Sequence, residues 1–460
     1  MLMFAKIRRF SPWLLLAFAA PLQATTLQAV GQFNAYAISS FNYQSTDIEG
    51  MIGSGGDVTY VGGDVGRNNV SSPYSIYSGG NVLLQGHAVK NGGIQANGSV
   101  TTTDVGIGGG INSGGNVSIT RGSMAAGSTI VNNGSLSTSN FAVQGNVLSQ
   151  GNVTVTTGSI NGDINSGGNV LTSKVGVNGN INALGNIEIK EGSSVVGNAF
   201  RANGNYRTNN HALKSDVHVG GTFTGVSGSV SGVIEAYGGV GAGNTFWLDP
   251  NKHLLGPSKA TLPSVTIDSH VSAAIDHFAI AQAIIGAGAE YAAMNKTADV
   301  VQEDNNPSVD NYILRGKHGL NVFDVDASML SKFASIRFEG FDDSTFIVNV
   351  SGSVVDIVSP GGFQFVGMDE TNVLFNMNQA ELVKLSGSFY GTILAANADV
   401  HTAGNGTIFG GLYADNISGS SQINSRYFRG EDPTEVPLPA TWILFAFGLL
   451  GLMRLKRNAA

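Results

Sequence analysis

Residues 151–170 read GNVTVTTGSINGDINSGGNV and contain the motif that decides the fold. Gly151-Asn152-Val153 returns as Gly168-Asn169-Val170, which is 17 residues later. The motif, a glycine followed by Asn, Asp or Ser and then usually an aliphatic residue, recurs throughout residues 55–206. Its glycines are Gly56, Gly63, Gly80, Gly98, Gly115, Gly134, Gly151, Gly168, Gly185 and Gly204, spaced from Gly63 onward by 17, 18, 17, 19, 17, 17, 17 and 19. A short, fixed period predicts stacked structural repeats.

A second series of glycines runs between the members of the first. It consists of Gly92, Gly109, Gly127, Gly145, Gly162, Gly179 and Gly197. Each member lies six or seven residues before a member of the first series. Two turns at a constant offset indicate that each repeat is one coil with corners at fixed places.

The sequence therefore predicts a mostly β chain, a β-solenoid (β-helix) with coils of 17–18 residues. We expect Gly to supply positive φ at the corners, with Asn or Asp tolerating the same turn. The aliphatic residue that follows would begin a short strand and point inward, leaving Asn, Ser, Thr and Gly outside. The alternative is a disordered Gly/Ser/Asn linker, but disorder has no reason to keep an aliphatic residue in this register.

Composition narrows the function classes. The chain has 460 residues with 64 Gly, only 12% charged residues, a net charge of −8 and no Cys. A negative chain without a Lys/Arg patch is not expected to bind nucleic acid. Without Cys it has no disulfide framework, thiol nucleophile or Cys-ligated metal. Low charge with many small polar residues favours an extracellular β protein.

The N-terminus has the features of a secretory signal peptide over residues 1–24. Lys6, Arg8 and Arg9 form a positive segment, and Trp13–Ala20 is apolar but too short to span a membrane as a mature helix. We expect cleavage after Ala24.

The C-terminal residues 431–460 have the features of a second targeting signal. Val436, Pro437, Leu438, Pro439 and Ala440 precede an apolar transmembrane segment at 441–453. Arg454, Lys456 and Arg457 follow and would stay cytoplasmic. A plain tail anchor is one reading. The order of features also closely resembles the PEP-CTERM sorting signal in its VPLPA form. That resemblance implies recognition by exosortase, transient insertion in the inner membrane, cleavage near the proline motif, and delivery to the cell surface or exopolysaccharide matrix of a Gram-negative bacterium.

The body of the chain, residues 25–430, resembles the choice-of-anchor A family. The resemblance rests on the opening residues 33–36 and 46–58, and on segments 346–352, 373–376, 391–398 and 410–415. Ala396 stands where the family usually has Pro. The resemblance implies a secreted, surface-displayed and adhesive protein, with exopolysaccharide or surface glycans as candidate partners.

One long α-helix is expected beside the solenoid, within residues 263–290. Pro263 and Asp268 are start signals, and Val271, Ile275, Phe278 and Ile285 recur at helical spacing. The helix would run from Ile267 to about Ile285 and cover one solenoid wall. Residues 305–430 are expected to form further β coils. A helix beside a β-solenoid is similar in architecture to ice-binding and related adhesive domains.

The sequence offers few candidates for chemistry, and we assign no catalytic, cofactor-binding or metal site. Asp268, His270, Asp276 and His277 lie on the expected helix. His270 and His277 are seven residues apart and could share a face and hold a metal, but such residues are more often the solvated side of a helix. Asp324 and Asp326 would point the same way from one strand, without a calcium-loop motif around them. Charges in the repeats (Lys174, Lys190 and Glu191) are scattered.

We therefore expect a structural or adhesive surface protein, not an enzyme. One alternative is a solenoid enzyme acting on extracellular polysaccharide, which an acidic cluster in one cleft would favour. The other is an ice-binding adhesin, which needs regularly aligned Thr. The sequence predicts that Thr101-Thr102-Thr103 and Thr154, Thr156 and Thr157 do not line up over successive coils.

Overall fold

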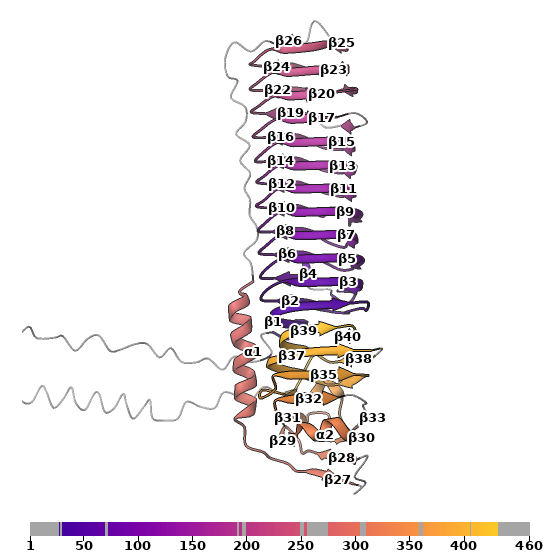
Figure 1. Cartoon of the computed structure of the whole chain (residues 1–460), viewed down its shortest axis with the longest axis vertical. Helices are drawn as coiled ribbons and strands as arrows, with labels where there is room; N and C mark the ends of the chain where they lie inside the picture. The colour runs from indigo at the N-terminus through magenta and orange to yellow at the C-terminus, as the bar shows by residue number, and fades with distance from the viewer. Residues whose placement is uncertain are drawn as a thin grey trace, which may run out of the picture.

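Strands stack in parallel along the molecule, apart from an antiparallel pair formed by Val300–Gln302 and Asp310–Arg315 (Figure 1). This computed structural model describes residues 27, 30–69, 72–190, 193–195, 199–248, 253–254, 275–303, 310–357, 362–404 and 406–430. Within them, strands β1 to β40 form a sheet of 33 strands and smaller sheets of four and three strands. The predicted β-solenoid is confirmed.

Most N-terminal coils combine one long bent strand with one short strand. The long strands are β1 (Phe33–Gln44), β3 (Val58–Val65), β5 (Val82–Val89), β7 (Val100–Ile107), β9 (Val117–Met124), β11 (Leu136–Val143), β13 (Val153–Ile160), β15 (Val170–Val177), β23 (Phe223–Val230) and β25 (Val240–Leu248). In two coils the long strand is divided into two pieces, which are β17 (Ile187–Ile189) with β18 (Ser194–Val195), and β20 (Tyr206–Thr208) with β21 (His211–Leu213). The short strands are β2 (Met51–Ser54), β4 (Tyr74–Ser78), β6 (Gly93–Ala96), β8 (Ile111–Ser113), β10 (Ile130–Asn132), β12 (Val147–Ser149), β14 (Ile164–Ser166), β16 (Ile181–Ala183), β19 (Ala199–Ala202), β22 (Asp216–Val219), β24 (Ile234–Ala236) and β26 (His253–Leu254).

The aliphatic residue of each motif begins a strand and is buried, as predicted. Val153 pairs with Val170, which pairs with Ile187, and all three are at most 1% exposed. Such columns form a continuous core. Gly63-Asp64-Val65 is an exception to the series: it lies inside β3, and Val58, not Val65, pairs with Val82.

The polar residue of each motif forms a ladder between coils. Its side-chain oxygen accepts a hydrogen bond from the backbone N–H of the corresponding residue in the next coil, at 2.7 to 3.2 Å. The ladder runs through Asp57, Asn81, Ser99, Asn116, Ser135, Asn152, Asn169, Asn186 and Asn205 to Thr222. This ladder pairs the turn backbone, which the strands leave unpaired.

The expected reason for the first-series glycines is wrong at most positions. Gly80, Gly98, Gly115, Gly151 and Gly168 do not have positive φ. They are required because coils approach closely: a Cβ on Gly168 would lie 2.4 Å from Asn152 Oδ1.

Left-handed backbone lies instead at the bend of each long strand. These bend positions are occupied mostly by residues other than glycine. Their φ values lie between 53° and 60°, at Asn140, Lys174, Thr157, Asp104 and Arg121. The bend changes the inward alternation, so Val105 and Ile107 of β7 point into the same core as Val100.

The C-terminal half completes the stack from its other end. Its strands are β27 (Val300–Gln302), β28 (Asp310–Arg315), β29 (Leu320–Asp326), β30 (Phe333–Glu339), β31 (Thr345–Ser351), β32 (Val354–Ile357), β33 (Gly362–Val366), β34 (Val373–Asn376), β35 (Leu382–Ser386), β36 (Phe389–Tyr390), β37 (Thr392–Ala403), β38 (Thr407–Phe409), β39 (Leu412–Gly419) and β40 (Gln422–Asn424), with the short helix α2 (Ala327–Lys332) and a 3-10 turn at Glu370–Asn372.

The first coil and the last coil meet in the middle of the stack. Strand β1 pairs in parallel with β3 on one side and with β39 on the other. Across this junction Tyr43 Oη lies 2.7 Å from Thr402 Oγ1 and donates a hydrogen bond to the Ser421 carbonyl at 2.6 Å. Figure 1 shows the consequence: the indigo strand β1 lies directly above the yellow strand β39.

Helix α1 (His277–Ala292) lies along the C-terminal coils, against β31, β34 and β37. The predicted start at Ile267 is wrong, because Ile275 and Asp276 are not helical and Asp276 Oδ1 caps the helix by accepting from Ala279 N at 2.9 Å. Residues 263–274 lie outside the described residues. The predicted buried stripe is also wrong, since Phe278 is 75% exposed. Small residues bring the helix close to the sheet instead: Ala283, Ala287 and Gly288 are buried, with Ile284 beside them.

Candidate functional groove

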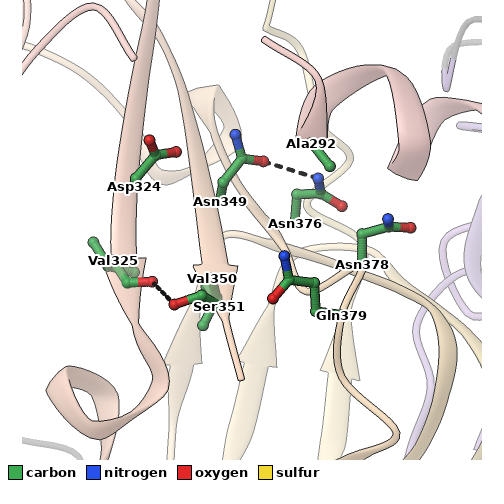
Figure 2. A pocket seen from close by; sticks show the side chains of 9 residues that line it. All are labelled: Ala292, Asp324, Val325, Asn349, Val350, Ser351, Asn376, Asn378 and Gln379. Carbon is green, nitrogen blue, oxygen red and sulfur yellow. Dashed lines mark hydrogen bonds between the residues drawn. The ribbon is translucent and has the colours of Figure 1, made fainter. Parts of the chain in front are cut away.

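A groove of about 340 Å³ opens beside the C-terminal end of α1. Figure 2 shows its lining side chains, which come from β29, β31, the end of β34 and the loop after it. They are Ala292, Asp324, Val325, Asn349, Val350, Ser351, Asn376, Asn378 and Gln379. Most of the polar groups are side-chain amides.

Two of these asparagines bind helix α1 to the solenoid. Asn349 and Asn376 are Cα partners in neighbouring strands. Asn349 Nδ2 donates to the Tyr291 carbonyl at 2.9 Å, and Asn376 Nδ2 donates to the Gly288 carbonyl at 3.0 Å. Asn376 Nδ2 also donates to Asn349 Oδ1 at 2.9 Å (Figure 2). The inner wall of the groove is therefore held by side chains with fixed partners.

The other polar groups at the groove make fewer or longer hydrogen bonds to the described residues. Asp324 is exposed, and its carboxylate makes no hydrogen bond to the described part of the chain; Gln379 is likewise exposed and unbonded there. Asn378 Oδ1 accepts a long bond of 3.4 Å from Asn397 Nδ2. Ser351 Oγ donates to the Val325 carbonyl at 3.2 Å and retains accepting capacity. The groove thus presents both donors and acceptors.

Asp324 and Asp326 both lie on the exposed face of β29, as predicted, but they have different roles. Asp324 lines the groove, whereas Asp326 caps α2 by accepting from Ser328 N at 2.9 Å, and hydrogen bonds from Ser328 lower the pKa of Asp326. The groove therefore contains one carboxylate, not the pair that glycoside hydrolysis generally uses. Among the described residues, no three His, Asp or Glu side chains gather as a metal site would require.

The remaining sequence candidates lie apart. Asp268 and His270 are outside the described residues, as are Ala24, the proline motif Val436–Ala440 and the segment 441–453. Asp276 caps α1, and the His277 ring contacts Tyr36. Within the described ranges no helix is long and apolar enough to cross a membrane.

The outer surface of the N-terminal coils carries aligned hydroxyl groups, which corrects the expectation for Thr. Thr101 and Thr154 share one outward column, and Thr103 and Thr156 share the next. The register gives the columns as Thr101, Ser118, Ser137, Thr154 and Leu171, and Thr103, Thr120, Ser139, Thr156 and Ser173. The sequence did not reveal them because Ser occupies several column positions (Ser118, Ser137, Ser139 and Ser173). In addition, Thr102 points inward and Thr157 occupies the bend.

The groove amides were not singled out from the sequence. Their signal was present in two segments, FIVNVS (346–351) and VLFNMNQ (373–379), which each place Asn after three apolar residues. In stacked coils, matching positions in such segments lie side by side, and these two asparagines do so.

A family model described as "Putative Ice-binding-like adhesive domain" matches residues 129–425, well over half of the chain. The chain belongs to this family. Within this ice-binding-like adhesive domain lie all the strands from β10 to β40 and the whole groove. No curated protein matches the sequence.

Solved structures with low overall similarity include an ice binding protein from an Antarctic bacterium of the Flavobacteriaceae (14% identity, 87% of this chain and 98% of that chain, TM-score 0.24). The tapirin C-terminal domain of Caldicellulosiruptor hydrothermalis is 13% identical over 76% of this chain and 92% of its own, with a TM-score of 0.25. A possible adhesin C-terminal domain from Caldicellulosiruptor kronotskyensis is 12% identical over 85% and 93%, with a TM-score of 0.20. These scores are too low to carry a structural argument.

Proposed function

We propose that this protein is a non-enzymatic adhesin, displayed on the surface or in the extracellular matrix of a Gram-negative bacterium. The observation that carries the proposal is the match of an adhesive domain family across residues 129–425. The solenoid supports it physically, because a parallel stack with a continuous core is a stiff spacer whose outer face exposes many small polar groups. Such a face can form many weak contacts with a polyhydroxylated surface.

Adhesion is tested with cells that carry or lack the gene. Cells with the intact gene should attach to surfaces coated with their own exopolysaccharide several-fold better than deletion cells, and the purified full chain should compete for this attachment. Equal attachment of both strains, together with no competition, would reject the adhesive function.

The route to the surface is part of the same proposal. The resemblance of the chain to the choice-of-anchor A family, and of residues 431–460 to the PEP-CTERM signal, supports export followed by exosortase cleavage near Val436–Ala440. Pro437 and Pro439 would keep the cleavage region extended, because Pro resists both helix and strand pairing.

Replacing Pro437 and Pro439 with Ala should therefore retain full-length precursor in the inner membrane. Mass spectrometry of the exported wild-type protein should find that about the last 20 residues, the length of a membrane segment, are missing. An exported protein that still ends at Ala460 would leave only the tail-anchor alternative.

A second candidate function, ice binding, is favoured by the aligned hydroxyl columns. Five coils present outward Ser or Thr in the column from Thr103 to Ser173, with neighbouring strands about 4.8 Å apart. A Lys at Thr120 would project from the centre of this face, whereas a Lys at Asn165 of β14 would project from another face. Inhibition of ice recrystallisation that is lost in Thr120→Lys and kept in Asn165→Lys would support this function. No inhibition by the wild-type protein would reject it.

A further inference from the structure

We propose that the groove beside α1 binds a neutral saccharide unit of an extracellular polysaccharide. This deepens the proposed adhesive function, on which it rests for its biological role. The ligand class follows from the order of the groove wall, the balance of donors and acceptors, and the charge at its rim.

The wall of the groove is pre-organised. Asn349 and Asn376 each donate to a helix carbonyl, and they bond to each other. Gly288 lies against the same wall, since a Cβ there would be 3.1 Å from Asn378 Oδ1 and 3.6 Å from Asn376 Oδ1. A ligand would therefore meet side chains whose rotamers are already fixed, which lowers the entropy cost of binding.

The inner wall also contains an unused acceptor. Asn376 is only 1% exposed, and its Oδ1 has no hydrogen-bond partner among the described residues. Leaving a buried acceptor unsatisfied is costly, and Asn376 belongs to the groove lining, where a bound molecule can supply the missing donor. A ligand hydroxyl, or a water bridging to one, would satisfy it.

The exposed groups match sugar hydroxyls. Asp324 offers a carboxylate that can accept two hydroxyl hydrogen bonds, and the Gln379 amide can donate and accept at once. Hydroxyls, which both donate and accept, fit such a mixed lining. The volume of about 340 Å³ falls in the usual range for small-molecule sites of about 300 to 1,000 Å³.

The same groups disfavour the other ligands that the groove could take. A calcium ion requires six to eight oxygen ligands and several negative charges. Among the lining residues only Asp324 is charged, the ammonium of Lys296 already interacts with it, and Asn349 Oδ1 accepts from Asn376. An acidic saccharide would be repelled by the carboxylate of Asp324. A neutral saccharide avoids both penalties.

The test measures binding of cellobiose, maltose and lactose to the purified full chain by calorimetry and by ligand-observed NMR. At least one disaccharide should bind at about millimolar affinity, and Asp324→Asn and Gln379→Ala should each weaken binding about tenfold, as expected for loss of a hydrogen bond that involves a charged or bidentate group. Two exposed residues outside the groove provide matched controls, and Asp342→Asn and Gln364→Ala should bind normally.

Failure of all three disaccharides to bind the wild-type protein would overturn the proposal, as would equal binding by all four variants. Saturable Ca²⁺ binding that Asp324→Asn removes would overturn it in favour of a cation site. Disaccharide binding by a protein that does not mediate cell attachment would support the groove assignment and reject the adhesive function alone.

Discussion

The hydroxyl of Tyr36 lies 2.9 Å from Nδ1 of His277, although 241 residues separate them in the chain. Tyr36 belongs to β1, and His277 is the first residue of α1, so this contact joins the middle of the solenoid to the helix that covers it. Burial lowers the pKa of His277, an effect larger than the opposing influence of Asp276, and burial also raises the pKa of Tyr36. At neutral pH the tyrosine hydroxyl therefore donates to an uncharged imidazole.

We predict that this contact makes the docking of α1 sensitive to acid. Because the pKa of His277 is lower in the folded protein than its ordinary value of 6.5, the unfolded chain binds the proton more readily. The stability from neutral His277 is fully present above pH 6.5 and is lost as the pH falls below it. Urea denaturation should give a lower free energy of unfolding at pH 5 than at pH 7.5.

The matched variant is His277→Asn, whose side-chain oxygen can still accept from Tyr36 but cannot be protonated in this range. Its free energy of unfolding should depend less on pH between 7.5 and 5 than that of the wild type. Identical pH dependence in the two proteins would contradict the assignment to His277.

Core columns and surface columns alternate along each strand, so adjacent residues should respond differently to the same change. Val170 is 1% exposed, and its neighbours in the stack, Val153 and Ile187, are equally buried. Leu171 points outward in the same strand. We expect Val170→Asp to unfold the N-terminal coils, since a buried unpaired carboxylate costs several kcal/mol, and Leu171→Asp to be tolerated. Circular dichroism and thermal melting measure both, and similar melting of the two variants would argue against the assigned register.

The sequence predicted the coils because their information is local. In a motif such as Gly151-Asn152-Val153, the glycine forms the turn, the asparagine accepts the ladder hydrogen bond and the valine enters the core. The constant period then predicts that successive coils stack. The position of β1 between β3 and β39 depends on the pairing of Ala35 with Leu412, which no local pattern encodes. The groove follows from the same long-range stacking, because Asn349 and Asn376 become neighbours only when their strands are in register.

The helix boundary was missed for a different reason. Hydrophobic periodicity favoured Phe278 as a core residue, but the packed face uses Ala287 and Gly288, whose small side chains let Asn376 reach a helix carbonyl. Tertiary contact outweighed the periodic pattern here. Asp276, not Asp268, provides the cap in the described structure.

Left-handed backbone at the bends predicts stabilising substitutions. Thr157 has φ of 58°, a conformation that is unfavourable for a β-branched residue, and its side chain is exposed. Thr157→Gly should raise the free energy of unfolding by about 1 kcal/mol, because relief of the left-handed strain exceeds the added entropy of the unfolded chain. Thr154→Gly, in regular strand backbone of the same coil, should lower it by about 0.5–1 kcal/mol. Equal effects at the two positions, measured by chemical denaturation, would show that the bend carries no strain.

Close packing between coils can be tested at two glycines. Gly168 lies in a turn, and Gly176 lies in the strand β15 that follows it. A Cβ at Gly168 would lie 2.4 Å from Asn152 Oδ1 and 3.0 Å from the Asn152 backbone nitrogen, whereas a Cβ at Gly176 would have no atom within 4 Å. Neither glycine has positive φ, so Ala adds no backbone strain of that kind at either site. Gly168→Ala must displace Asn152 and weaken its 2.8 Å bond from Asn169 N, and we expect a loss of about 1–3 kcal/mol. Gly176→Ala should change the free energy of unfolding by less than about 0.5 kcal/mol. Equal stability of the two variants in chemical denaturation would contradict the inference that the first-series glycines are required for close approach of the coils. It would also contradict the inference that the asparagine ladder sets the spacing of the turns.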